Sequence, residues 1–219
     1  MGQIRLVVFD LDGTLVDSRR DLASATNDLI RELGGRTLEE QAIVEMVGEG
    51  ASVLVARALR AAGLDDRTPG ALRRFLELYE PRLLDTTRLY SGMREALDRL
   101  TATATLAVLT NKPDRATHRL LDGLGVTELF AHVVAGDSPF GRKPDPAGLL
   151  DLVARTGVTA ASTVMVGDSA IDLSTARRAG TRVCLARYGF GFRFTATDFR
   201  GDEWFVDRPL DLPELLAPR

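Results

Sequence analysis

Two aspartates, Asp10 and Asp12, directly follow an apolar run at residues 4–9. Side chains at positions i and i+2 of a strand point to the same face, so we expect both carboxylates to leave the strand end together. Two carboxylates that close repel each other unless a cation or a shared proton relieves them. The pair therefore favours a cation site or an acid/base pair. Its Asp-Gly step is also typical of a hairpin turn that leads into a second strand at residues 14–16.

Polar side chains also follow apolar runs later in the chain. They are Thr110 and Asn111 after residues 105–109, Lys143 in a loop with two prolines, and Asp168 and Asp172 after residues 163–166. The carboxyl ends of parallel strands lie along one edge of a sheet, so these groups can converge with the first pair. The chain has only two lysines, Lys112 and Lys143, against 26 arginines. We interpret Lys143 as the ligand-binding lysine and Lys112 as a solvated neighbour.

This set of side chains suits phosphate chemistry. Carboxylates and hydroxyls are typical ligands of a hard cation such as Mg²⁺, and a lysine with a hydroxyl suits a phosphoryl group. Together they favour phosphoryl transfer, which needs charge neutralisation and in-line positioning. We expect Asp10, at the strand end, to be the nucleophile, because aspartate can form an aspartyl-phosphate. Asp12 would then protonate the leaving alkoxide and activate a water molecule.

The elements that must position these groups change character along the chain. Helical spacing predicts helices over residues 22–33, 38–47, 51–62 and 72–83, with no strand pattern between residues 17 and 88. From residue 91 onward, helices alternate with strands expected at residues 105–109, 130–135, 163–166, 182–186 and 203–206. This alternation predicts an α/β fold, a Rossmann-like, doubly wound parallel sheet with right-handed crossovers. We expect a core domain of residues 1–16 and 89–219 with a small all-helical cap domain, residues 17–88, inserted into it.

Composition limits the partners and the compartment. The net charge of −3 gives no broad attraction to nucleic acid or to an anionic membrane. No apolar segment approaches the ~20 residues that a membrane span needs. Cys184 is the only cysteine, so no internal disulfide can form, which fits a reducing cytoplasm. We expect a cytoplasmic monomer or homodimer that acts on a small phosphorylated metabolite.

Four short motifs, in chain order, resemble the signature motifs of the haloacid dehalogenase-type phosphohydrolases. They are Asp10-x-Asp12-Gly13-Thr14, Thr110-Asn111, Lys143-Pro144 and Gly167-Asp168-x-x-x-Asp172. The resemblance implies that Asp10 is the nucleophile and Asp12 the acid/base. It also implies that Thr110 and Lys143 hold the phosphoryl group. We expect Asn111, next to Thr110, to bind the substrate as well. The implied Mg²⁺ ligands are Asp10, the backbone carbonyl of Asp12 and Asp168, with Asp172 next to the ion.

Within that family, the helical insertion looks like a small cap that closes over the site. Residues 46–51 and 57–59 look most like the phosphoglycolate phosphatase branch, which implies 2-phosphoglycolate as the substrate. Gly48, Glu49, Gly50 and Arg57 would then help to select it, although Glu49 carries the wrong charge for an anion. Residues 15–19 and 86–91 are the expected hinges of the cap.

Other interpretations stay open. A sugar phosphomutase can use the same scaffold if its cap excludes water, and a non-catalytic binding protein would not need these side chains. A phosphonate hydrolase is disfavoured because residues 17–88 hold no lysine for a Schiff base. A halide-removing enzyme would leave Asp12 and the metal carboxylates without a role. We expect Asp17 and Ser18 to cap the first cap helix, and residues 187–202 show no clear pattern.

Overall fold

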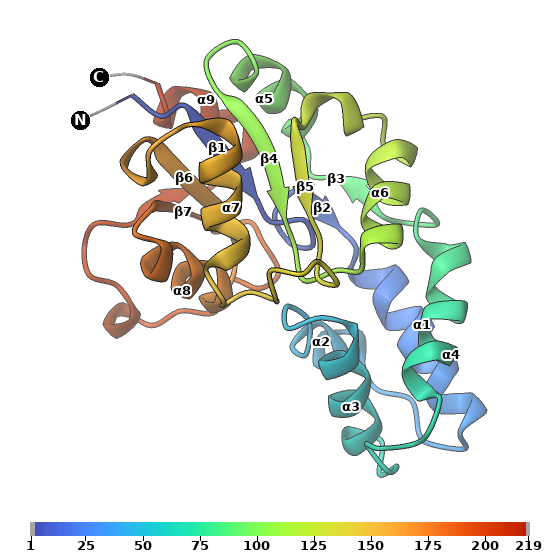
Figure 1. The fold of residues 1–219 in the computed structure, drawn as a ribbon. Helices are drawn as coiled ribbons and strands as arrows, with labels where there is room; N and C mark the ends of the chain where they lie inside the picture. The colour runs from blue at the N-terminus through green and yellow to red at the C-terminus, as the bar shows by residue number, and fades with distance from the viewer. Residues whose placement is uncertain (1–2, 218–219) are drawn as a thin grey trace.

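Figure 1 shows the computed structural model, which describes residues 3–217. A parallel sheet of six strands runs in the order β5-β4-β1-β6-β7-β8. The strands are β1 (Leu6–Phe9), β4 (Thr105–Leu109), β5 (His132–Val134), β6 (Thr163–Gly167), β7 (Arg182–Ala186) and β8 (Trp204–Val206). Because β1 pairs with both β4 and β6, the carboxyl ends of these three strands lie side by side. The predicted fold class is confirmed.

Strand β1 is buried on both faces, which explains its uninterrupted apolar sequence. Val7 and Phe9 point into one apolar layer, and Leu6 and Val8 point into the other. The first layer is covered by α5 (Met93–Leu100), α6 (Asp114–Gly123) and α9 (Leu212–Leu215), and the second by α7 (Ala147–Thr156) and α8 (Ala170–Ala179). The sheet therefore has helices on both faces, as a doubly wound fold requires.

The residues between β1 and β4 add a separate group of helices. They are α1 (Arg19–Glu32), α2 (Glu40–Val44), α3 (Ala51–Ala61) and α4 (Ala71–Tyr79). These four helices pack on one another and lie beyond the carboxyl ends of β1 and β4 (Figure 1). We propose residues 17–88 as the cap domain, and residues 1–16 and 89–219 as the core domain.

Two short strands lie where the chain enters the helical insertion, here called the first passage, and where it leaves the insertion, the second passage. Strand β2 (Val16–Asp17) pairs antiparallel with β3 (Arg88–Leu89). They include only the end residues of the insertion, 17 and 88, so residues 18–87 hold no strand, as expected. The hairpin interpretation of residues 14–16 was wrong. Val16 pairs with Leu89, and its contact with the Asp12 region is a single isolated bridge.

A buried carboxylate clamps these two passages together. Asp21, at the start of α1, is 3% exposed and accepts hydrogen bonds from both the N–H and the hydroxyl of Thr86 and of Thr87. The four donors lie 2.6 to 3.1 Å from its oxygens. Burial alone would raise the pKa of Asp21, but these hydrogen bonds outweigh it and lower the pKa. The clamp therefore joins the predicted hinge at residues 86–91 to the start of α1, just beyond the predicted hinge at residues 15–19.

The observed helices differ from the expected ones mainly at their ends. Helix α4 stops at Tyr79 and continues as a 3-10 turn at Glu80–Arg82, because Pro81 has no N–H to donate. Helix α2 covers only the middle of residues 38–47. Further 3-10 turns lie at Thr127–Leu129, Ala160–Ser162, Ala196–Asp198 and Pro209–Asp211. None of the helices within residues 3–217 has the length and apolar character needed to cross a membrane.

Candidate active site

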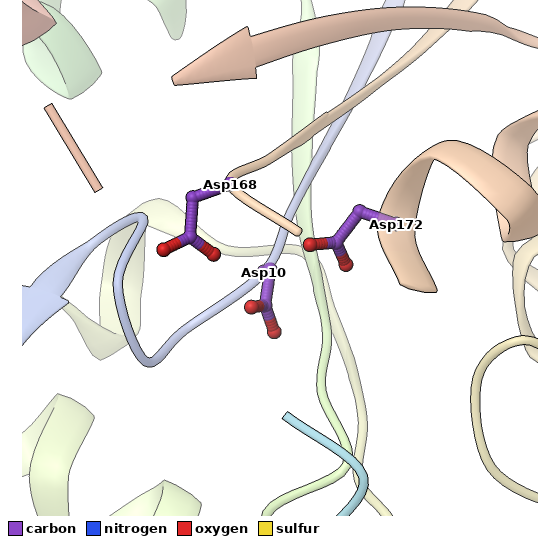
Figure 2. Close-up of side chains that lie close together, drawn as sticks. All are labelled: Asp10, Asp168 and Asp172. Carbon is purple, nitrogen blue, oxygen red and sulfur yellow. The ribbon is translucent and has the colours of Figure 1, made fainter. Parts of the chain in front are cut away.

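Three carboxylates meet at the carboxyl edge of the sheet. Asp10 follows β1, Asp168 follows β6, and Asp172 lies in the first turn of α8 (Figure 2). Each offers an oxygen within 4.8 Å of those of the other two, and all three residues are buried. The neighbouring positions of β1 and β6 in the sheet produce this convergence, as the strand-end argument predicted.

The cluster concentrates negative charge where water is scarce. Burial raises the pKa of Asp10 to about 7, more than the nearby Lys143 lowers it, and Asp172 raises it further. Burial, with Asp10 and Asp172 as like charges, also raises the pKa of Asp168 well above its ordinary value. A hard cation between these oxygens would relieve the repulsion and keep the carboxylates ionised. The residues present therefore fit a metal site.

Lys143 binds two of the three carboxylates. Its ammonium donates to Asp10 Oδ1 at 2.6 Å and to Asp172 Oδ1 at 2.7 Å. Burial would lower the pKa of Lys143, but these two carboxylates outweigh it and raise the pKa, so the lysine stays charged. The other oxygen of Asp172 accepts from the N–H and the hydroxyl of Ser169, at 3.1 and 2.6 Å. Asp172 therefore fixes the position of Lys143 as well as adding charge.

Asn111 organises the loops around Lys143. Its side-chain oxygen accepts from the Lys143 N–H at 2.8 Å, and its amide nitrogen donates to the Lys143 carbonyl at 2.9 Å. The same nitrogen donates to the Gly48 carbonyl of the helical insertion at 2.9 Å. The Thr110 hydroxyl, also buried, accepts from the N–H of Lys112 at 3.2 Å. Asn111 thus joins the β4 end, the Lys143 loop and the cap.

Lys112 differs from the expectation of a solvated neighbour, which was wrong. It is 6% exposed, and its ammonium donates to both oxygens of Asp12, at 3.0 and 3.1 Å, and to the Tyr79 hydroxyl at 2.7 Å. The physical reason is that Asp12 and the cap residue Tyr79, both distant in sequence, lie against this side chain in the folded chain. The scarcity of lysine was the signal in the sequence.

Ser18 also contacts Asp12. The expectation that Ser18 caps α1 was wrong for its side chain, which makes no capping hydrogen bond and donates to Asp12 Oδ1 at 2.6 Å. Asp17 accepts from the N–H and the guanidinium of Arg19 at the start of the helix. The Asp12 carboxylate is therefore held by two donors, the Lys112 ammonium and the Ser18 hydroxyl.

The cap residues named from the sequence lie less deeply. Glu49 and Arg57 form an ion pair with each other, and both side chains are about two-fifths exposed. Gly48 and Gly50 have φ of 124° and 92°, which glycine adopts readily. A Cβ on Gly50 would lie 3.1 Å from the Asn111 carbonyl oxygen, so this glycine also allows a close approach to the core.

Residues 187–202, which the sequence left without an interpretation, also contribute to the site. The Gly191 N–H donates to Asp168 Oδ2 at 2.7 Å. A Cβ on Gly189 would lie 2.2 Å from the Cβ of Asp168, so only glycine fits there. The Tyr188 hydroxyl donates to the Thr14 carbonyl at 3.0 Å, which holds the segment against the loop after β1. The glycines spaced between aromatic residues were the available signal.

A cavity lies between the sheet edge and the cap. Its cap side is apolar and includes Leu22, Val47, Leu54, Phe75 and Leu76. Within residues 3–217, the charged side chains that line it are those of Asp10, Asp12 and Lys112. A small polar substrate in this space would be enclosed by apolar walls and would meet charge only at the sheet edge.

The model of the haloacid dehalogenase-like hydrolase family matches residues 7–186. The chain is 43% identical over 194 residues to phosphoglycolate phosphatase from Rhodospirillum rubrum, covering 85% of this chain and 80% of that one. It is 34% identical to phosphoglycolate phosphatase from Haemophilus influenzae, over 98% of both chains.

Solved structures agree. The crystal structure of a predicted phosphoglycolate phosphatase from Haemophilus somnus 129pt superposes with a TM-score of 0.89 at 31% identity, covering 98% of this chain and 99% of that one. The match to the family model spans all four motifs, and the relatives extend over most of the chain. This chain therefore belongs to the haloacid dehalogenase-like hydrolases.

Proposed function

We propose that the protein is a Mg²⁺-dependent phosphatase that hydrolyses 2-phosphoglycolate to glycolate and phosphate. The observation that carries this proposal is the buried cluster of Asp10, Asp168, Asp172 and Lys143 beside the Asp12 carboxylate. The names of the relatives supply the substrate. A cluster of charges this costly to bury supports a catalytic purpose more than a structural one.

In the proposed reaction, an Asp10 carboxylate oxygen attacks the phosphorus atom of the substrate. The bond from phosphorus to the glycolate oxygen breaks, and Asp12 gives that oxygen its proton. Water then attacks the phosphorus of the aspartyl-phosphate, and Asp12 takes a proton from the water. Phosphate leaves, and Asp10 is regenerated as a carboxylate.

We propose that Thr110 and Lys143 bind the phosphoryl group. Thr110 directly follows β4, and Lys143 lies in the loop between β5 and α7. Asn111 supports them by holding the Lys143 loop. Asp10, Asp168 and the backbone carbonyl of Asp12 would hold the Mg²⁺, with Asp172 beside it. When bound, the ion supplies charge neutralisation for the cluster and for the phosphoryl oxygens. Lys143 is already placed to offset part of the same charge.

For the cap, we assign substrate selection to Gly48, Glu49, Gly50 and Arg57. The ion pair between Glu49 and Arg57 supports this, because it offsets the negative charge that would otherwise repel an anionic substrate. The apolar cavity wall favours a small substrate. We also propose that the protein works as a monomer or homodimer with no nucleic-acid partner. The buried, free Cys184 supports a reducing cytoplasm as its compartment.

A panel of small phosphomonoesters tests the function. Purified protein with Mg²⁺ is expected to release phosphate fastest from 2-phosphoglycolate, and to release almost none after chelation. If an isomer of a sugar phosphate accumulates instead of inorganic phosphate, the protein is a mutase. If no substrate of the panel is turned over although Mg²⁺ binds, the binding-protein interpretation holds.

A further inference from the structure

The two lysines of the chain bind different carboxylates at the edge of the sheet. Lys143 binds Asp10, the proposed nucleophile, whereas Lys112 binds both oxygens of Asp12, the proposed acid/base. Both ammonium groups are buried, at 3% side-chain exposure. Lys143 belongs to one of the four family motifs, whereas Lys112 has no role in the steps of the proposed reaction.

The second partner of Lys112 comes from the helical insertion. Tyr79 is the last residue of α4, and its hydroxyl accepts from the Lys112 ammonium at 2.7 Å. The ammonium also lies 4.6 Å from the centre of the Tyr79 ring. Phe75, one turn earlier on α4, stacks against that ring with centroids 5.6 Å apart. Lys112 is therefore fixed between a core carboxylate and a rigid aromatic pair of the cap.

Two hydrogen-bond donors restrict the position of the Asp12 carboxylate. Besides Lys112, the Ser18 hydroxyl donates to its Oδ1 at 2.6 Å. Lys112 and Ser18 together set the direction of the carboxylate, which lines the cavity that would receive the leaving group. Proton transfer requires the acid within hydrogen-bond reach of its target, and a small misplacement is costly.

We propose that Lys112 is a positioning residue that orients Asp12 toward the leaving oxygen, and that Tyr79 of the cap holds Lys112 in that place. The inference rests on the proposed function, because it needs Asp12 to act on a phosphomonoester. Since Tyr79 belongs to α4, the acid/base is fully oriented only when this end of the cap packs against the core.

The leaving group provides the test. An alkoxide such as glycolate needs a proton as it departs, whereas nitrophenolate leaves without one. Loss of Lys112 should therefore slow phosphoryl transfer to Asp10 far more for an alkyl phosphate than for p-nitrophenyl phosphate. Hydrolysis of the aspartyl-phosphate is common to both substrates, so the comparison uses kcat/KM, which reports the steps up to departure of the leaving group. A merely structural role would slow both alike.

We would measure kcat and KM of Lys112→Met, Lys112→Arg and Tyr79→Phe on both substrates at saturating Mg²⁺. For Lys112→Met, we expect kcat/KM on 2-phosphoglycolate to fall about 100-fold, at the low end of what acid/base catalysis contributes. On p-nitrophenyl phosphate, whose leaving group needs no proton, we expect kcat/KM to fall less than about threefold. Lys112→Arg should recover part of the loss. Tyr79→Phe keeps the aromatic packing and should show the same selectivity with a smaller fall, which secures the test if Lys112→Met unfolds.

Arg99→Met is the matched control, since it removes an exposed cation from α5 far from the site and should change neither substrate. An equal fall in kcat/KM on both substrates would overturn the inference. So would a rise in KM for 2-phosphoglycolate with kcat unchanged, because Lys112 would then bind the substrate carboxylate. Failure of the proposed function looks different, since the unaltered protein itself would not hydrolyse either ester.

Discussion

The two sides of the site are built in different ways. On the core side, Lys143 joins Asp10 and Asp172 in an ion network with side-chain exposures of 12% or less. On the cap side, Glu49 and Arg57 pair in partial contact with water, with exposures of 43% and 42%. Charges fixed in a dry environment can act on a transition state without reorganising, whereas a solvated pair gains little energy from its own contact. The difference supports the proposal that the core carries the chemistry and the cap the substrate selection.

The largest expected effect is at the nucleophile. Asp10→Asn keeps the shape of the side chain but removes the attacking oxygen anion, so kcat/KM should fall on the order of 10⁴-fold or more. Phosphate release from 2-phosphoglycolate measures it, and circular dichroism confirms the fold. Substantial residual turnover would show that Asp10 is not the nucleophile, and the comparison of a catalytic core side with a selecting cap side would then fail.

Matched lysine and arginine variants compare the two sides directly. Lys143→Met leaves two buried carboxylates without their cation and should lower the free energy of unfolding by about 3–5 kcal/mol. Arg57→Met, on the cap, should change it by less than about 1 kcal/mol. Urea denaturation without Mg²⁺ gives both values. Similar losses of unfolding free energy in the two variants would show that the buried core network stabilises the protein no more than the exposed cap pair does.

The clamp between the two passages is the next test. Asp21→Asn should destabilise the protein by about 2–4 kcal/mol at pH 7, because four donors lose a charged acceptor. The pKa of Asp21 is lowered in the folded state, so its contribution is present above the unfolded pKa of about 3.9 and is lost as the pH falls through the folded value. The gap between the two proteins should therefore close in acid, and a gap that widens there would contradict the assignment.

Metal binding should stabilise the core side specifically. At 100 times its dissociation constant, Mg²⁺ is expected to add about 2.7 kcal/mol to the free energy of unfolding. Chelation should remove this gain, and Asp168→Asn should reduce it, as followed by thermal unfolding. Glu45→Gln, an exposed cap residue, is the matched control and should keep the full gain. A gain that survives in Asp168→Asn would place the ion elsewhere.

The smallest effect is expected at the cap pair. Glu49→Ala leaves Arg57 without its partner, so KM for the anionic substrate should change by less than about tenfold, with kcat and stability nearly unaltered. Steady-state kinetics with 2-phosphoglycolate measure this. A large fall in kcat would instead show that Glu49 takes part in the chemistry, which would blur the division between the two sides.

The sequence was informative where one strand or helix fixes a side chain by itself. Asp10 and Asp168 follow continuous apolar runs, so the sheet order alone brings them together. Lys112 was misjudged because its neighbours, Asp12 and Tyr79, lie 100 and 33 residues away, and only the packing of the cap reveals them. The contact of Gly191 with Asp168 could not be predicted for a similar reason, since almost any residue type can donate a backbone N–H.

The pairing of Val16 with Leu89 has a consequence for protein engineering. The insertion begins and ends at neighbouring points, so a different helical unit can be grafted there without stretching the sheet edge. Such a graft would nevertheless carry away Ser18 and Tyr79, two of the three groups that hold Asp12 or its lysine. A chimera designed for a new substrate should therefore bring a hydroxyl at each of these two positions.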